Sequence, residues 1–599
     1  MPLVHRFRRA ACCTLLAATA TPFVVCGQMN PPRSSVTALL EDMGYGPFAV
    51  GFKSMVLFDT SRTYDLNMGD TLLPAAPQVG RPIVVNVWYP AKATTTDRCR
   101  VRDFLNFTQN DTTRSFIIAL KKYSDKQCRM YGPELYLQLD NMAGDTAQLE
   151  ARRDQVYTSY MDLQTRSYLQ AEPHAGTWPM AIYHQGLGGT MDEAWLLLEY
   201  LASHGIVGVS SAFQDPDDYI DIGVGNLQAT VTDLGFLIDQ RQRYMPQASD
   251  QVILMGHSFG ANYIPCYIAR GRRDVRCLVL LDNDLAHSIG NFFRETDDPL
   301  DAEHIGYLDI PIHCASRTAA EFSLLDRMRS APRTYIRIDD MEHDQFTSLG
   351  ALHSALSAPS VKEPAMLERA AGNYPLLCQT ILFFIEHTVR DAPALKAEDI
   401  GAREGWWFRS VPPGETLPWN MPYDPSKAAC PTRPQLVSLM PTIGPDSAGR
   451  ILSRCEDQLV DTLDRSMEVF IAGAYSAYST EELILFLDAI GEMEDTSAPF
   501  FLFYVGSMGW LYTPLPSAER TQATERAIEL GKYIVERHPK SIYGPMMIIL
   551  TYGPNSTGTD YRPYFEQLIQ LDPDFLREGP GYYLEEWIYD SVQKFKEGK

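Results

Sequence analysis

Short apolar runs alternate with longer amphipathic stretches between about residue 47 and residue 390. Several short runs are rich in Val and Ile with little polar alternation, which is typical of strands buried on both faces. We expect strands at 83–89, 180–183, 206–210, 252–255, 277–281, 310–314 and 334–338. Amphipathic stretches predict helices at 191–203, 227–243, 259–270 and 319–329. The repeated order of strand and helix predicts an α/β fold with a mostly parallel sheet that helices cover on both faces.

A polar stretch of about 80 residues, 94–177, interrupts this rhythm. We expect a partly helical insertion there, which could form a cap over a site. Residues 28–390, including this insertion, then form one α/β domain.

The composition shifts again further along the chain. We expect a Pro-rich linker at 391–435, because 411–427 reads VPPGETLPWNMPYDPSK. Residues 436–599 have a helical pattern without convincing strands. Two similar pieces end at Pro539 and Pro573, which are 34 residues apart. That is the period of tetratricopeptide repeats, although an ordinary helical domain explains the pattern equally well.

The start of the chain predicts a secretory signal peptide at residues 1–27. Arg6, Arg8 and Arg9 precede an apolar stretch that ends near Gly27. A basic segment, an apolar segment and a small residue are the parts of such a peptide. We therefore expect an exported protein, secreted or periplasmic.

Eight cysteines follow the predicted signal peptide, and an even number in an exported chain is compatible with disulfides. Local pairs in loop-rich stretches are Cys99 with Cys128 and Cys430 with Cys455. Cysteines in apolar runs, expected to be buried thiols, are Cys266, Cys277 and Cys314. No Cys and His spacing matches a zinc site, so we expect no metal and no cofactor.

Composition and charge narrow the partners. The 599 residues are 45% hydrophobic and 21% charged, which indicates a globular protein, and the net charge is −23. An acidic chain repels phosphate backbones and anionic membranes, so we expect no nucleic-acid partner. No apolar run after the signal peptide is long enough to span a membrane.

The most specific motif is Gly256-His-Ser258-Phe-Gly260, which lies between a predicted strand and a predicted helix. This is the G-x-S-x-G nucleophile elbow in its strand–turn–helix context. The turn strains the backbone of Ser258, and side chains at the two glycines would clash. Ser258 is therefore the expected nucleophile.

A serine nucleophile needs a base and an acid, which follow it in the order Ser, acid, His on this fold. Asp282 directly follows the strand at 277–281, and Asp284 lies two residues later. His343 follows the strand at 334–338 and precedes a helix. Strand ends are where open α/β sheets place their sites, so His343 is the expected base.

An oxyanion hole should lie beside the serine. One donor is expected to be the amide of Phe259, the residue after the nucleophile. The second should come from the glycine-rich loop 184–189, HQGLGG, which follows an earlier strand. His184 is expected to support this loop rather than to act as a base.

The chain resembles the platelet-activating-factor acetylhydrolase family, close to the dienelactone-hydrolase-like proteins of the α/β-hydrolase superfamily. The resemblance covers about residues 45–390 and rests on five pieces of sequence: PIVVNVWYPA at 82–91, HQGLG at 184–188, LASHG at 201–205, GHSFG at 256–260 and LLD at 280–282. It implies a calcium-independent serine esterase that releases short or oxidised acyl chains from phospholipids. It also implies Asp282 rather than Asp284 as the acid, and the Leu187 amide as an oxyanion donor. Gln185 is an insertion relative to the family's loop.

The sequence thus predicts an exported serine hydrolase that cleaves carboxylic esters, with a small-molecule or lipid ester as substrate. A serine peptidase or an acyltransferase would use the same three residues, because all of them pass through an acyl-enzyme. A non-catalytic interaction protein is the third alternative, in which the C-terminal helical region binds a protein partner.

Overall fold

The computed structural model describes the chain between residues 36 and 571, with gaps. The described ranges are 36–62, 80–107, 113–130, 146–186, 188–213, 224–269, 274–283, 309–317, 325, 328–358, 364–396, 405–417, 430–431, short pieces within 435–489, 517–552 and 562–571. The signal peptide predicted at 1–27 and the candidate Asp284 lie outside these ranges.

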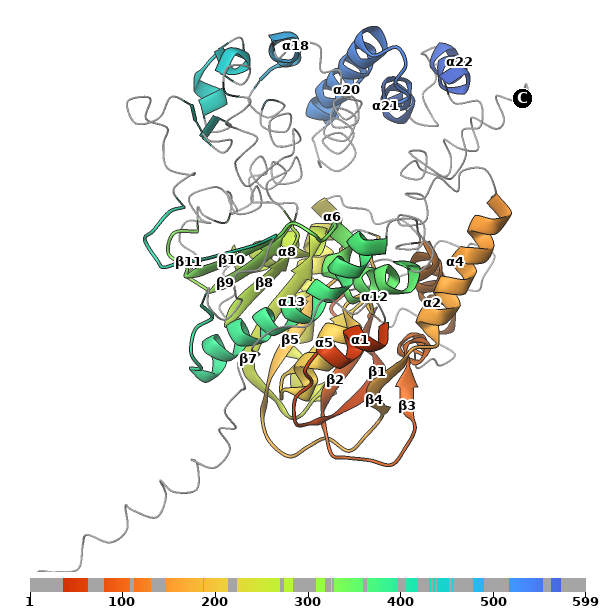
Figure 1. Cartoon of the computed structure of the whole chain (residues 1–599), viewed down its shortest axis with the longest axis vertical. Coiled ribbons are helices and arrows are strands. Elements are labelled where there is room, and N and C mark those ends of the chain that lie inside the picture. The colour runs from red at the N-terminus through yellow and green to blue at the C-terminus, as the bar shows by residue number, and fades with distance from the viewer. Residues whose placement is uncertain are drawn as a thin grey trace, which may run out of the picture.

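Within the described residues, eleven strands form a single sheet (Figure 1). In chain order they are β1 (Ala49–Asp59), β2 (Arg81–Ala91), β3 (Arg98–Arg100), β4 (Gln164–Leu169), β5 (Trp178–His184), β6 (Val207–Ser211), β7 (Ala248–His257), β8 (Cys277–Leu281), β9 (Ile312–Ser316), β10 (Arg333–Ile338) and β11 (Trp406–Val411). Across the sheet the order is β11-β10-β9-β8-β7-β5-β6-β2-β1-β4-β3.

The strand order identifies the fold. Strands β6, β5, β7, β8, β9 and β10 pair in parallel, and β2 pairs antiparallel with both β1 and β6. Without β3, β4 and β11, the order reads β1-β2-β6-β5-β7-β8-β9-β10. With a tight strand-to-helix turn after β7, this is the α/β-hydrolase fold, as the sequence predicts.

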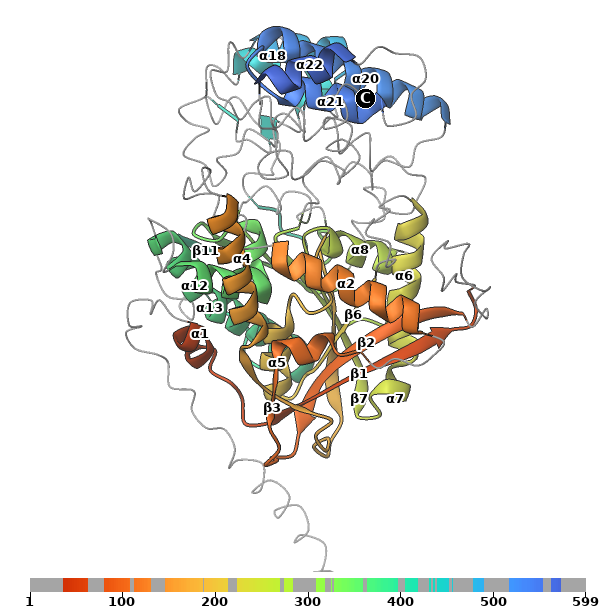
Figure 2. The same cartoon turned by 90° about the vertical axis from the view of Figure 1, so that its right-hand side faces the viewer.

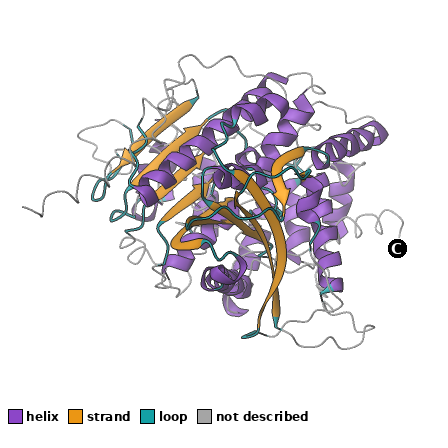
Figure 3. Ribbon diagram, turned by 90° about the horizontal axis from the view of Figure 1, so that it is seen from below, coloured by secondary structure: helices purple, strands orange, loops and turns teal. Residues whose placement is uncertain are grey.

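Helices cover both faces of this sheet (Figure 3). One face carries α1 (Val36–Asp42), α5 (Trp195–Ser203), α12 (Ser348–Ser357) and α13 (Pro364–Arg390), and the other carries α6 (Val224–Asp239) and α8 (Ser258–Ala269). Each face has its own apolar cluster: the first lies between the sheet and α1, α5, α12 and α13, and the second lies between the sheet and α6 and α8. Along β5, Ala181 and Tyr183 belong to the first cluster, whereas Met180 and Ile182 belong to the second. Strands that bury both faces read as continuous apolar runs, which is why the sequence revealed them.

All seven predicted strands are present within a few residues of their expected bounds. Three of the four predicted helices are also present, the second of them as α6 followed by the short α7 (Arg241–Tyr244); most of 319–329 lies outside the described residues. The strands β1, β3, β4 and β11 were not predicted. They lie toward the two edges of the sheet, where half-exposed strands lack a continuous apolar run.

The insertion at 94–177 is partly helical, as predicted, and it also extends the sheet. It contains β3, the 3₁₀ turn η1 (Val101–Leu105), α2 (Arg114–Met130), α4 (Thr146–Met161) and β4, and its two helices face the viewer in Figure 2. Strand β4 pairs in parallel with β1. Trp195 at the start of α5 donates its indole N–H to the Tyr160 hydroxyl of α4, at 3.2 Å. The insertion is therefore joined both to the sheet edge and to the helix that follows the glycine-rich loop.

Residues 405–417, inside the expected linker 391–435, pack on the α/β domain. Strand β11 pairs antiparallel with β10, and Val411 and Leu417 are buried in the second apolar cluster. The Pro-rich composition concealed a strand because only six residues, WWFRSV, form it.

The structure contains one of the two predicted local disulfides, Cys430–Cys455, with Cα atoms 5.7 Å apart. The prediction of a Cys99–Cys128 bond is wrong, because both are free, buried thiols. Cys128 lies in the last turn of α2, with its Sγ atom 3.7 Å from the Asp192 carboxylate rather than facing β3. Cys266, Cys277 and Cys314 are buried thiols, as predicted.

The C-terminal helices have an apolar core of their own. Among the residues that the structure describes, they include α18 (Thr480–Ala489), α20 (Ser517–Arg537), α21 (Tyr543–Tyr552) and α22 (Arg562–Leu571), preceded by the 3₁₀ turn η5 (Met440–Thr442). Both views draw these helices together, away from the sheet (Figures 1 and 2). Helices α20 and α21 cross closely at Gly531 and Gly544, since a Cβ atom at Gly544 would lie 2.8 Å from the Val535 nitrogen. Pro573 lies outside the described residues, so the repeat remains a prediction.

None of the helices among the described residues combines the length and the apolar character needed to cross a membrane.

Candidate active site

The glycine-flanked serine lies at a strained turn between β7 and α8. Ser258 has a φ of +52°, in the left-handed region that costs a non-glycine residue about 1–3 kcal/mol. A Cβ atom at Gly256 would lie 2.8 Å from the Ala261 nitrogen, and one at Gly260 would lie 2.2 Å from the Gln185 carbonyl oxygen. These contacts confirm the predicted clash at both glycines. The turn holds the Ser258 hydroxyl at the N-terminus of α8.

His343 reaches this serine from the C-terminal end of β10, the same end of the parallel strands that carries Ser258. It opens the 3₁₀ turn η2 (His343–Phe346), which follows β10 and precedes α12. Its Nε2 atom lies 2.7 Å from the Ser258 Oγ atom. The structure thus brings together two residues that are 85 positions apart in the sequence.

Asp282 completes a hydrogen-bonded chain of three side chains. Its Oδ2 atom lies 2.6 Å from His343 Nδ1, on the side of the imidazole opposite Ser258. Asp282 follows β8 directly and has a φ of +38°, a second strained position at the same site. Ser258, Asp282 and His343 therefore meet at the C-terminal ends of the parallel strands β7, β8 and β10.

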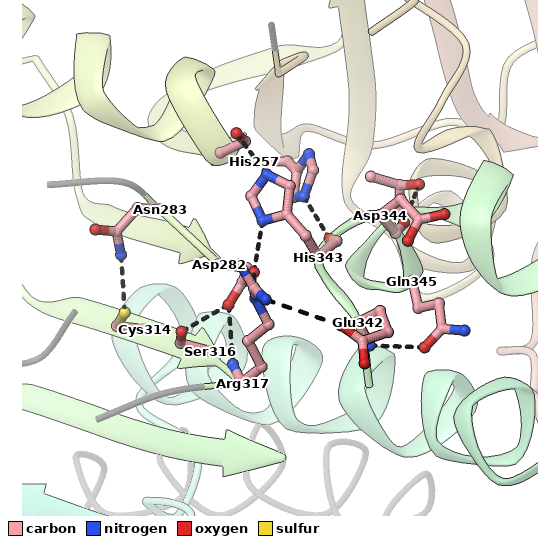
Figure 4. A network of polar contacts seen from close by, with 12 residues as sticks. His257, Asp282, Asn283, Cys314, Ser316, Arg317, Glu342, His343, Asp344 and Gln345 are labelled. Atoms are coloured by element: carbon pink, nitrogen blue, oxygen red, sulfur yellow. Dashed lines mark hydrogen bonds and ion pairs between the residues drawn. The ribbon is translucent and has the colours of Figure 1, made fainter. Parts of the chain in front are cut away.

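Donors surround the Asp282 carboxylate, which is buried. Ser316 Oγ lies 2.7 Å and the Arg317 backbone N–H nitrogen 2.9 Å from Oδ1, while Arg317 Nε lies 3.0 Å from Oδ2. Figure 4 shows Asp282 between His343 on one side and this pair on the other. Burial by itself raises the pKa of the Asp282 carboxyl, but the Arg317 guanidinium and the hydrogen bonds from His343 and Ser316 outweigh it and hold that pKa well below its usual range. Asp282 is therefore ionised at neutral pH and accepts every one of these bonds.

This charge state fixes the tautomer of His343. An ionised carboxylate has no proton to donate, so His343 Nδ1 carries the hydrogen of the 2.6 Å bond. In a neutral imidazole the Nε2 atom then holds a free lone pair and accepts a hydrogen bond from the Ser258 hydroxyl.

The glycine-rich loop after β5 lies against the serine. A Cβ atom at Gly186 would lie 3.0 Å from the Ser258 Cβ atom. The Phe259 amide is the second backbone N–H of α8, where helical amides lack a partner within the helix. Leu187, the other predicted oxyanion donor, lies outside the described residues.

A buried carboxylate, Glu193, anchors this loop. Its Oε1 atom accepts hydrogen bonds from the Tyr183 hydroxyl at 2.8 Å and from the Gly186 amide at 3.1 Å. Its backbone carbonyl accepts from the Leu349 amide of α12 at 2.9 Å. Glu193 therefore ties the glycine-rich loop to the segment that follows His343.

His257, the residue before the serine, contacts both His343 and Glu193. Its Nε2–H donates to the His343 carbonyl oxygen at 2.8 Å, and its Nδ1 atom lies 3.7 Å from Glu193 Oε1. The backbone position of His343 is therefore linked to the residue before the serine.

The remaining histidines do not approach Ser258 in the described contacts. His184 lies within its own loop, with Nδ1 2.7 Å from the Gln185 carbonyl oxygen, and its ring stacks on Phe213. Burial lowers the pKa of His184 to about 4, so its imidazole is neutral at pH 7. His313 is enclosed in β9 and His353 in α12.

Sequence reasoning missed the residues that support the three side chains: Glu193, His257, Ser316 and Arg317. Ser316 and Arg317 carried a recognisable signal, because they stand at the end of the strand between those that carry Asp282 and His343. Glu193 carried none, since its role depends on the fold of the loop before it. Among the described residues, no group of three or more His, Cys, Asp or Glu side chains is placed to hold a metal ion.

No family model and no curated protein matches this chain. A ferulic acid esterase from Streptomyces cinnamoneus has a TM-score of 0.38 and 16% identity, over 60% of this chain and 96% of that one. DcsB in complex with its substrate analogue has a TM-score of 0.25 and 13% identity, over 36% and 91% of the two chains. Est1E from Butyrivibrio proteoclasticus has a TM-score of 0.24 and 13% identity, over 30% and 86%.

Proposed function

We propose that this chain is a serine hydrolase that cleaves carboxylic ester bonds through an acyl-enzyme. One observation carries the proposal: the hydrogen-bonded chain from Ser258 Oγ to His343 Nε2 and from His343 Nδ1 to Asp282 Oδ2. A nucleophile within reach of a base, with the base held by a third group, is the arrangement that activates a hydroxyl for acyl transfer.

In the proposed reaction, Ser258 Oγ attacks the ester carbonyl carbon while His343 Nε2 takes the hydroxyl proton. Asp282 holds the imidazole in the required tautomer and stabilises the imidazolium that forms. His343 then gives the proton to the departing alcohol, which leaves Ser258 acylated. Water, activated by His343 in the same way, releases the acid and restores the serine.

The tetrahedral intermediate carries a negative oxygen that needs donors. We assign this role to the backbone amides of Phe259 and Leu187. The close approach of Gly186 to Ser258 supports this assignment, because it puts the start of the glycine-rich loop beside the nucleophile. The N-terminus of α8 also favours the developing charge.

For the substrate, we propose a short acyl ester, with phospholipids that carry short or oxidised acyl chains as the class to test first. The sequence resemblance to the platelet-activating-factor acetylhydrolase family supports this choice, since it includes the strand, loop, elbow and acid segments of the α/β domain. We further propose export of the chain, on the strength of the signal-peptide pattern in residues 1–27.

We assign residues 436–599 to a separate helical unit that serves a protein partner rather than catalysis. The close pair of α20 and α21, followed by α22, and the 34-residue spacing of Pro539 and Pro573 support a tetratricopeptide-like unit.

A fluorophosphonate probe tests the proposed function, because it reacts with activated serines. The wild-type protein should be labelled, and Ser258→Ala should lose both labelling and several orders of magnitude of ester turnover. A panel of short-chain esters, long-chain esters and short peptides then separates an esterase from a peptidase. An unlabelled, folded wild type would refute the proposal and favour a non-catalytic protein.

A further inference from the structure

The Asp282 carboxylate is shared between two side chains that can both be cationic. His343 Nδ1 lies 2.6 Å and Arg317 Nε lies 3.0 Å from the same oxygen, Oδ2. The other oxygen is occupied by Ser316 Oγ and the Arg317 amide. The four acceptor positions of a carboxylate are thus filled, and one negative charge faces both a guanidinium and an imidazole.

Arg317 and Asp282 together influence the protonation of His343. When His343 takes up a proton, the imidazolium forms next to the Arg317 guanidinium, and like charges at this range repel. The ion pair with Arg317 also neutralises part of the negative charge of Asp282, and that charge would otherwise stabilise the imidazolium. Both effects favour the neutral, proton-accepting form of His343.

We propose that Arg317 is a positioning residue that sets the acidic limit of activity, by opposing the protonation of His343 through their shared carboxylate. The inference deepens the proposed function and rests on it. Arg317 keeps the base neutral in solutions more acidic than an isolated Ser-His-Asp site would tolerate.

Other charged groups near His343 come from several elements. Among the described residues, those that face it or its direct contacts are Asp282 after β8, Arg317 after β9, His257 at the end of β7 with Glu193 behind it, and the chain neighbours Glu342 and Asp344. On α12 and α13, which pack against η2, His353 lies against Tyr160, Tyr374 bonds Ser348, and Arg369 pairs with Asp340. Variants at Arg317 leave all of these in place, so a comparison between variants isolates the guanidinium.

Glu342 provides a matched control of opposite sign. Its Oε2 atom lies 3.8 Å from Arg317 NH1, and Figure 4 draws this ion pair beside Asp282. Glu342 is half exposed and partly neutralises the guanidinium. Removing its charge should strengthen the effect of Arg317 on His343, although solvent screening keeps the change small.

The experiment measures the rate constant of fluorophosphonate labelling from pH 4 to pH 9, which reports the ionisation of the free enzyme. In Arg317→Gln the pH at half-maximal rate should rise by about one unit, as expected for removing one half-exposed charge. Arg317→Lys should restore most of the wild-type midpoint, because it keeps the charge. Glu342→Gln should lower the midpoint by a few tenths of a unit.

The outcomes distinguish this inference from the proposed function. If the folded wild type is not labelled at Ser258, the proposed function fails. If the wild type is labelled but Arg317→Gln lowers the plateau rate without moving the midpoint, Arg317 only supports the structure and the inference is wrong. A higher KM for anionic esters with an unmoved midpoint would make Arg317 a substrate-binding residue and would also overturn it.

Discussion

The α/β sheet and the C-terminal helices both bury apolar side chains, but they place their polar side chains differently. In the sheet, Ser258, Asp282 and His343 each follow a parallel strand, and their side chains meet within hydrogen-bond distance. In α20, apolar side chains such as Leu530 and Ile534 line the buried stripe, while the charged Glu525, Glu529 and Lys532 point to solvent.

The difference follows from the geometry of the two architectures. The C-terminal ends of parallel strands lie side by side, so residues from distant parts of the sequence converge there. A helix pair presents neighbouring residues along one stripe and exposes the rest. Chemistry is therefore expected in the sheet, and contact with a partner is the more natural use of the helices. The following predictions test this division.

The largest expected effect is on the triad acid. Asp282→Asn keeps the size of the side chain but removes the charge that orients His343, so turnover should fall about 10⁴-fold. Ester hydrolysis by the purified variant, with circular dichroism to confirm folding, measures this. Asp284→Asn is the control and should change turnover little. The reverse ranking would place the acid on Asp284.

The same carboxylate predicts a loss of stability in acid. The pKa of Asp282 is held well below its ordinary value in the folded state, mainly by Arg317 and His343 acting against burial. The unfolded chain binds a proton near pH 4 while the folded chain does not, so the stability that Asp282 contributes is lost as the pH falls below about 4. Denaturant titrations of wild type and Asp282→Asn between pH 3 and pH 7 should show a smaller pH dependence in the variant. If the free energy of unfolding depended equally on pH in both proteins, the ion pairs of Asp282 with Arg317 and His343 would be contradicted.

A truncation separates the two regions. A chain that ends after residue 425 keeps β11 and Leu417 and should fold and hydrolyse small esters at close to the full-length rate. A chain that ends after residue 400 exposes the sites of Val411 and Leu417 and should lose at least about 4 kcal/mol of stability, at about 2 kcal/mol for each buried side chain.

Thermal unfolding and ester turnover of both truncated chains measure this prediction. Loss of turnover in the longer, folded chain would show that the C-terminal helices complete the site. Equal stability of the two chains would show that 405–417 contributes nothing to the α/β domain.

Asp192, the residue before Glu193, should destabilise the protein at neutral pH. It is fully buried, its Oδ1 atom has no hydrogen-bond partner among the described residues, and burial raises its pKa to about 6. The folded state therefore holds a proton between pH 4 and pH 6 that the unfolded state releases, so stability falls as the pH rises through about 6. Asp192→Asn should be more stable at pH 8 by up to about 3 kcal/mol.

Denaturant titrations at pH 4 and pH 8 check this prediction, and the advantage of Asp192→Asn should vanish at pH 4. A variant that is less stable than wild type at pH 8 would mean that the carboxylate is bonded and stabilising.

The smallest expected effect is at Glu193. Glu193→Gln keeps an acceptor for Tyr183 and Gly186 but replaces charge-assisted hydrogen bonds with neutral ones, a difference of about 1 kcal/mol. Turnover should fall roughly fivefold, in kcat rather than KM, if the anchored loop supplies the proposed oxyanion donor. Steady-state kinetics measure the split. A change confined to KM would place Glu193 in substrate binding.

The sequence revealed the parts of this protein that local patterns determine. The apolar runs at β5, β7 and β8 identified the sheet, and the elbow around Ser258 identified its own turn. His343 could be singled out because it follows a strand and precedes a helix. The choice of Asp282 over Asp284 drew on family resemblance as well as on its place at the end of β8.

The sequence could not reveal contacts that depend on tertiary structure. Nothing local to Glu193 indicates that its carboxylate binds the glycine-rich loop. Strand β11 was hidden by the prolines around it, and Cys128 faces Asp192 rather than Cys99 because its helix packs on the loop after β5. Such contacts are set by packing between elements, which no short pattern encodes.

The central claim, that Ser258 forms an acyl-enzyme, is tested most directly by mixing the wild-type protein with an activated short-chain ester and following the first turnover. The account predicts a burst of about one equivalent of released alcohol. It also predicts that peptide mass spectrometry of the quenched mixture finds the added acyl group on Ser258, and that Ser258→Ala shows neither. A folded wild type that turns over the ester without a burst and without an acylated peptide, or an acyl group found on another residue, would contradict it.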